Sequence, residues 1–117
     1  MIRGKPIISM DFDGVINLYI TRLRNSNIIP DPPVEGIKEV IDELRKKYYV
    51  AISSARASTK EGRQSIMEWL NKYSIVVDEV IDRKLPAEIH IDDRCICFDG
   101  DTNSLIDKIK SFKPWNR

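Results

Sequence analysis

Short apolar runs of strand length alternate along this chain with longer segments in which apolar residues recur at helical spacing. The strand-like runs cover residues 6–10, 49–52, 75–77, 80–81, 88–91 and 95–98. Strands that alternate with helices are typical of an α/β fold built on a parallel sheet. We therefore expect a three-layer, Rossmann-like, mostly parallel sheet with helices on both faces.

Three helices are predicted between these strands. Asp31 can cap the first helix, with Pro32 at its first position, and that helix should run to about Lys47. Its buried face should comprise Val34, Ile37, Val40, Ile41 and Leu44. Ser58 and Glu61 form a capping box for a second helix, which buries Ile66, Trp69 and Leu70. Asp101 can cap a last helix that carries Leu105, Ile106 and Ile109.

Residues 14–33 are the one long segment without a clear core pattern, and they are rich in proline and asparagine. We expect a loop or flap here, with a short hairpin where Ile16, Leu18 and Ile20 alternate. The chain of 117 residues should form a single domain over residues 1–117. Neither residues 14–33 nor residues 57–83 leave room for an inserted second domain.

The first apolar run ends in Asp11-Phe12-Asp13-Gly14, which places two carboxylates two residues apart at the end of a strand. Like charges at this spacing repel each other, and a cation relieves that repulsion. Carboxylate oxygens suit Mg²⁺, which prefers hard oxygen ligands. This pattern therefore points to Mg²⁺ as a cofactor.

Other polar residues follow later strands: Ser53, Ser54 and Arg56 after the second, and Asp92 and Asp93 after residues 88–91. In an open α/β sheet, ligands bind outside the carboxyl ends of the strands. Residues distant in sequence should therefore meet in one crevice.

Composition narrows the classes of function. The formal net charge is +1, which gives no strong signature of nucleic-acid binding. No apolar run approaches the roughly 20 residues of a membrane span, so we expect no membrane association. Cys95 and Cys97 are two residues apart and poorly placed to bridge each other. A cytoplasmic protein fits these features, and a homo-oligomer remains an open alternative.

The set Asp11-Phe12-Asp13-Gly14-Val15, Ser54, Lys84 and Asp92-Asp93 resembles, in order, the four motifs of the haloacid dehalogenase (HAD) superfamily. The C-terminal part, residues 94–115, also resembles small, capless HAD-like hydrolases of bacteria and phages. This resemblance implies a Mg²⁺-dependent phosphatase that acts through an aspartyl-phosphate intermediate.

The resemblance also implies a role for each residue. Asp11 would be the nucleophile and Asp13 the general acid and base. Ser54 and Lys84 would bind and stabilise the phosphoryl group, with Ser53 as an alternative to Ser54. Mg²⁺ would be held by Asp11, Asp92 and the backbone carbonyl of Asp13.

The roles of two residues stay open at this point. Asp93 would bind the ion, directly or through water, or orient Lys84. Arg56 would contact the substrate phosphate or be an ordinary surface arginine. His90 is expected to be a strand residue rather than a ligand.

The substrate expected from this interpretation is a phosphorylated small molecule or a phosphorylated polymer end. The sequence does not choose between a nucleoside monophosphate, a sugar phosphate and such an end. Two other classes compete: a non-catalytic or regulatory binding protein on the HAD fold, and a receiver-like phospho-acceptor domain. Receivers carry the phosphorylated aspartate on a middle strand and the adjacent acidic pair on the first, the reverse of the order here.

Overall fold

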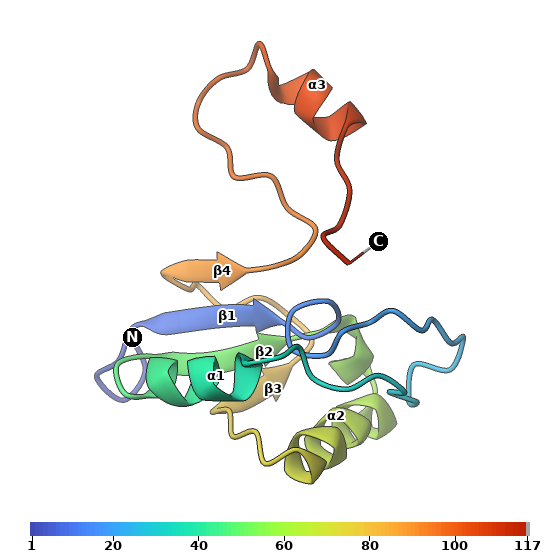
Figure 1. Ribbon diagram of the computed structural model, residues 1–117. Coiled ribbons are helices and arrows are strands. Elements are labelled where there is room, and N and C mark those ends of the chain that lie inside the picture. The colour runs from blue at the N-terminus through green and yellow to red at the C-terminus, as the bar shows by residue number, and fades with distance from the viewer. Residues whose placement is uncertain (117) are drawn as a thin grey trace.

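A computed structural model describes residues 1–116 of the chain, and its centre is a four-stranded parallel sheet (Figure 1). The strands are β1 (Ile7–Asp11), β2 (Tyr49–Ser53), β3 (Glu79–Ile81) and β4 (Ile89–Ile91), in the spatial order β3-β2-β1-β4. Each neighbouring pair is parallel. The α/β class with a parallel sheet is therefore confirmed.

The two central strands are the apolar runs of the sequence. The first four residues of β1 and of β2 are buried, and many of them are β-branched, as strands buried on both faces require. The register aligns Asp11 with Ser53 and Met10 with Ile91. The three strands β1, β2 and β4 therefore end side by side.

Helices α1 (Ile37–Arg45) and α2 (Lys60–Lys72) both pack against one face of this sheet. That face carries Ile8 and Met10 of β1 and Val50 and Ile52 of β2, since side chains two residues apart share a face. From the helices come Ile41, Ile66, Trp69 and Leu70, all buried. The predicted stripe of the second helix is thus confirmed.

The opposite face is covered differently. Its buried hydrophobic residues are Ile7, Tyr49 and Ala51, and they contact Ile2, Leu85 and Ala87 from loops. Within residues 1–116 this cluster contains no helical residue, so the expected helices on both faces are not confirmed.

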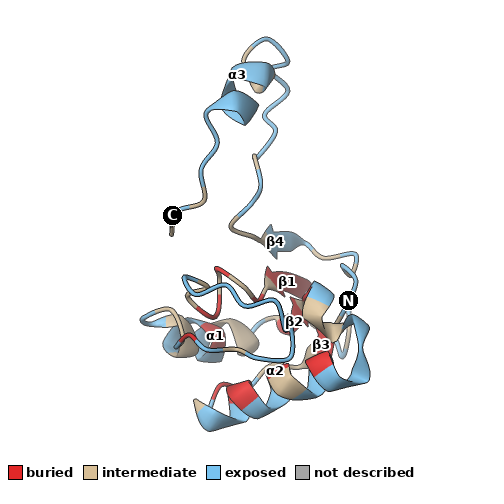
Figure 2. Ribbon diagram, turned by 90° about the vertical axis from the view of Figure 1, so that its right-hand side faces the viewer, coloured by how far each residue is buried: buried red, intermediate tan, exposed pale blue. Residues whose placement is uncertain are grey.

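The third helix, α3 (Leu105–Lys110), stands away from the sheet on a long excursion that follows β4 (Figures 1 and 2). Figure 2 shows it as almost wholly exposed, and Ile106 and Ile109 are both more than half exposed. The chain then returns to the body, where the Trp115 indole Nε1–H donates to the Gly14 carbonyl at 2.7 Å. Asn116 donates in the same way to the Leu18 carbonyl at 2.6 Å.

The start of the first helix differs from its prediction. It begins at Ile37, five residues after Pro32, because Gly36 precedes it in a left-handed conformation with φ 82°. The Asp31 carboxylate does not cap it and instead accepts a hydrogen bond from the Thr21 backbone N–H at 2.7 Å. Val40 is about half exposed, so it does not belong to the buried face.

The second and third helices also start differently from their predictions. The N-cap of α2 is Thr59, whose hydroxyl accepts from the Gly62 N–H, and Ser58 ends a short 3₁₀ helix over Ala55–Ser58. Asp101 does not cap α3 directly, but it accepts from the Ser104 hydroxyl just before the helix.

Two predicted strands are absent from the described residues. Residues 75–77 form a loop in which Ile75 is buried, so their apolar character reflects burial rather than strand pairing. Residues 95–98 lie in the excursion, and both cysteines there are free and exposed.

The flap, residues 14–33, contains no helix or strand of its own. The predicted hairpin is wrong, because the Phe12 carbonyl accepts from the N–H groups of Val15, Ile16 and Asn17 and closes a tight turn there. Ile16 is buried beneath this turn, whereas Ile20 is exposed. No helix among the described residues combines the length and the apolar character needed to cross a bilayer.

Candidate functional site

Three carboxylates meet at the carboxyl end of the sheet. Asp11 ends β1, and Asp92 and Asp93 directly follow β4, which lies beside β1 in parallel. One carboxylate oxygen from each residue lies within 4.8 Å of the others. The structure thus brings together three of the four residues predicted to surround the metal, and it leaves the Asp13 side chain outside the group.

Crowding of these carboxylates has an electrostatic consequence. Burial, the nearby charge of Asp92 and a hydrogen bond with Asp93 raise the pKa of Asp11 from 3.8 to about 7. Among the described residues, the Asp93 Oδ1 atom is buried and has no hydrogen-bond partner. A cation would lower the pKa of Asp11 and satisfy that oxygen, so the donor set fits a hard divalent ion.

The turn after β1 lets Asp93 reach this position. Gly14 has φ 83°, a left-handed conformation that residues with a Cβ adopt at a cost. A Cβ built on Gly14 would overlap the Asp93 Oδ2 atom and lie 2.7 Å from its Cγ. Glycine at this position therefore leaves room for the Asp93 carboxylate in the acidic cluster.

A cavity of about 250 Å³ opens beside the cluster. Its polar lining includes Asp11, Lys84 and Asp92 of the predicted residues, and also Ser9, Ser53, Asp82 and His90. The Lys84 Nζ lies 3.6 Å from the Asp92 Oδ2, yet its side chain is 60% exposed. A cation so exposed is weakly engaged, and it remains available to an anion in the cavity.

The structure distinguishes the two neighbouring serines. Ser53 lines the cavity, in register with Asp11. Ser54 is only 5% exposed, and its hydroxyl accepts from the Arg56 N–H at 3.2 Å as the N-cap of the 3₁₀ helix. Ser53, the alternative in the sequence interpretation, is therefore the serine placed to contact a ligand.

Ser9, Asp82 and His90 line the cavity but were not predicted as site residues. A signal was available for each of them. Ser9 lies two residues before Asp11 on the same strand face, and His90 is its register partner on β4. Asp82 directly follows the last residue of β3. Other site residues were predicted because they lie at the carboxyl end of a strand, and Asp82 has the same position.

Asp13 and Arg56 form an ion pair next to the flap and away from the cavity lining. The Arg56 Nε donates to the two Asp13 carboxylate oxygens at 3.0 and 2.9 Å, and the Asn17 amide donates to Oδ1 at 2.8 Å. The Arg56 side chain is 11% exposed, which contradicts the surface-arginine alternative. Its present partner is Asp13, so contact with a substrate phosphate stays a prediction.

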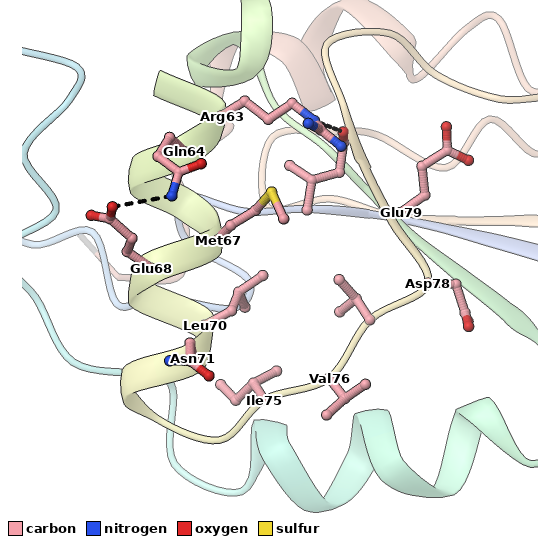
Figure 3. Close-up of a pocket in the computed structure, with 12 residues that line it drawn as sticks. Arg63, Gln64, Met67, Glu68, Leu70, Asn71, Ile75, Val76, Asp78 and Glu79 are labelled. Atoms are coloured by element: carbon pink, nitrogen blue, oxygen red, sulfur yellow. Dashed lines mark hydrogen bonds between the residues drawn. The ribbon is translucent and has the colours of Figure 1, made fainter. Parts of the chain in front are cut away.

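A larger groove of about 510 Å³ lies elsewhere, between α2 and the segment that leads into β3 (Figure 3). Its floor is apolar, with Leu70 and Ile75, and it contains no residue predicted for the site. Several polar groups that line it are already paired: Arg63 donates to the Val80 carbonyl, and Gln64 donates to Glu68. The smaller cavity beside the carboxylates is therefore the better candidate for chemistry.

Neither the family models nor the curated proteins contain a match to this chain.

Proposed function

We propose that this protein is a Mg²⁺-dependent phosphatase, a small capless enzyme of the HAD-like type that its motifs resemble. The observation that supports this most is the group of Asp11, Asp92 and Asp93 beside a cavity that also exposes Lys84 and Ser53. A carboxylate nucleophile, a cation site and an ammonium group are the parts that phosphoryl transfer needs.

Asp11, Asp92 and Asp93 would hold Mg²⁺, together with the backbone carbonyl of Asp13 and water. Mg²⁺ keeps several waters in its octahedral shell, so few protein ligands suffice. When bound, the ion would neutralise charge on the phosphoryl oxygens. The crowding that raises the pKa of Asp11 to about 7 supports this assignment, because the cluster is costly without a counter-charge.

Asp11 would act as the nucleophile. One of its oxygens forms a bond to phosphorus while the bond from phosphorus to the leaving oxygen breaks, which gives an aspartyl-phosphate. Lys84 and the Ser53 hydroxyl would stabilise the charge on the phosphoryl oxygens. Attack by water on the phosphorus then releases inorganic phosphate and restores the Asp11 carboxylate.

Asp13 would serve the proton transfers. It would give a proton to the leaving oxygen in the first step and take one from the attacking water in the second. Its carboxylate now accepts hydrogen bonds from Arg56 and Asn17, so these contacts must rearrange before it donates a proton.

The size of the cavity bears on the substrate. About 250 Å³ is below the roughly 300–1,000 Å³ of sites that enclose a drug-sized ligand. The cavity would accept the phosphoryl group, with the rest of a phosphorylated small molecule or polymer end outside, near the flap. No cap domain is needed, since α2 and the flap occupy the two positions where caps are inserted.

The test is repeated release of inorganic phosphate from p-nitrophenyl phosphate in millimolar Mg²⁺, with EDTA and Asp11→Asn as controls. An enzyme releases many phosphates per chain and loses this activity in both controls. About one phosphate per chain would indicate a receiver-like acceptor, and none would indicate a binding protein; either result would overturn the proposal.

A further inference from the structure

The guanidinium group of Arg56 joins two parts of the molecule that are far apart in sequence. Its Nε donates to the Asp13 carboxylate at 3.0 and 2.9 Å. Its Nη1 donates to the backbone carbonyls of Ser26 at 2.6 Å and Ile28 at 3.1 Å. One side chain therefore holds both the predicted general acid and the flap.

The outer part of the flap, residues 22–28, depends on this contact. All seven residues are exposed, and within the described chain their only hydrogen bonds to residues outside the flap come from Arg56. The other hydrogen bonds of this stretch are local, from Asn27 and Ile28 back to Asn25. Its attachment to the body should therefore weaken when Arg56 is lost.

Tyr19 contributes to the same arrangement. Its ring centroid lies 5.9 Å from the Arg56 Cζ and 5.4 Å from the Arg22 Cζ, within the range of cation–π attraction. Tyr19 also adopts a left-handed backbone conformation, with φ 52°. The flap is thus turned toward Arg56 at a cost to its backbone.

We infer that Arg56 is a positioning residue that couples the flap to Asp13, so that movement of residues 22–28 and reorientation of the Asp13 carboxylate occur together. A planar guanidinium presents its donors in a fixed fork, and a shift that breaks the carbonyl contacts also changes the direction of Nε. A larger substrate that displaces the flap would therefore release Asp13 to reach the leaving oxygen. The catalytic part of this inference rests on the proposed phosphatase function.

The coupling can be tested without any activity, by trypsin cleavage after Arg22 and Arg24 in the native protein. Arg56→Gln and Arg56→Lys should both cleave there several-fold faster than the wild type. Arg56 uses two separate nitrogens, Nε toward Asp13 and Nη1 toward the two carbonyls, whereas glutamine and lysine each carry their donors on a single nitrogen. Arg63→Gln is the matched control. It removes an arginine that also donates to a backbone carbonyl, that of Val80, but that lies on α2 outside the flap contact.

The link through Asp13 is tested by a double-mutant cycle. Asp13→Asn removes the charge that holds Arg56, and it should also accelerate cleavage after Arg22 and Arg24. In the Arg56→Gln background the same change should have no further effect. Wild-type cleavage in Asp13→Asn, or an equal acceleration with and without Arg56, would overturn the coupling. If Arg56→Gln fails to fold by thermal melting, Arg56→Lys decides the outcome.

The catalytic consequence has its own measurement. A poor leaving group, such as an alkyl alcohol, needs a proton from Asp13, whereas p-nitrophenolate leaves with little help. Arg56→Lys frees Asp13 without any movement of the flap, so it should raise kcat for a small alkyl phosphate by about tenfold relative to kcat for p-nitrophenyl phosphate. An equal change in kcat on both substrates would overturn the positioning role. If the wild type hydrolyses neither substrate, the phosphatase proposal fails, and the cleavage experiment still decides whether Arg56 couples flap and Asp13.

Discussion

The carboxylate of Asp93 occupies the space in which a Cβ at position 14 would lie. Gly14 follows β1, and Asp93 follows β4, so this contact sets how closely the two loops approach at the end of the sheet. The approach brings Asp93 within reach of Asp11 and Asp92.

Gly14→Ala should therefore weaken Mg²⁺ binding and lower turnover more than it lowers stability. Gly36→Ala is the matched control, because Gly36 has nearly the same φ, 82° against 83°, but has nothing within 4 Å of a built Cβ. Both variants should lose about 1–2 kcal/mol from the left-handed backbone. Titration of the melting temperature with Mg²⁺ separates them: the response should fall in Gly14→Ala alone, and an equal response in both would contradict the steric argument.

The raised pKa of Asp11 predicts how stability depends on pH. The unfolded chain titrates Asp11 near 3.8 and the folded chain near 7, so between these values the folded state binds more protons. The contribution of Asp11 to stability is then fully present below about pH 4 and is lost as pH rises through 7. Without Mg²⁺, the melting temperature should therefore fall as the pH rises from 5 to 8. Millimolar Mg²⁺ should raise the melting temperature more at pH 8 than at pH 5. An equal rise at both pH values would argue against a metal on Asp11.

Asp11→Asn should abolish turnover and yet stabilise the metal-free protein at pH 8. The amide is a poor nucleophile, but it has a similar shape and removes one of three crowded negative charges. The melting temperature in EDTA should rise above that of the wild type, and Mg²⁺ should add little to it. Glu39→Gln, an exposed acid in the first turn of α1, serves as the control and should change neither property. Wild-type turnover in Asp11→Asn would eliminate the proposed mechanism.

Lys84→Ala should reduce kcat/KM by about 10²–10³ with almost no change in stability. Its ion pair with Asp92 is long, at 3.6 Å, and the lysine side chain is 60% exposed, so little folding free energy depends on it. Phosphate release and thermal melting measured on the same preparation check both parts. A large loss of stability would place Lys84 in the structure rather than in the site.

The position of the acidic cluster was predictable from the sequence because two simple rules sufficed. Apolar runs marked β1 and β4, and parallel strands end at the same edge of the sheet. Asp11, Asp92 and Asp93 could therefore be grouped, although 80 residues lie between the first two. Choosing between Ser53 and Ser54 needed the exact end of β2, since a shift of one residue turns a side chain to the other face.

The contacts of Asp31 and Arg56 could not be predicted in this way. Asp31 followed by Pro32 reads as the start of a helix, but the structure uses its carboxylate to bind the Thr21 N–H inside the flap. Arg56 reaches Asp13 across 43 residues, and no local pattern reports such a pair. Helices were expected on both faces of the sheet, and this expectation depended on where α3 packs. The apolar pattern of a helix predicts which of its sides is buried, but it does not predict the surface against which that side packs.

The hydrogen bond from Trp115 to the Gly14 carbonyl bears on when the site is completed during synthesis of the chain. Its two residues are 101 positions apart, so the turn after β1 obtains this donor only after Trp115 has been made. The pairing of β1 with β2 needs only residues up to 53 and can precede it. Contacts of long sequence separation are also the costly ones in loop-closure entropy. A nascent chain should therefore pair β1 with β2 early, and the turn after β1 should settle only once residue 115 has been made.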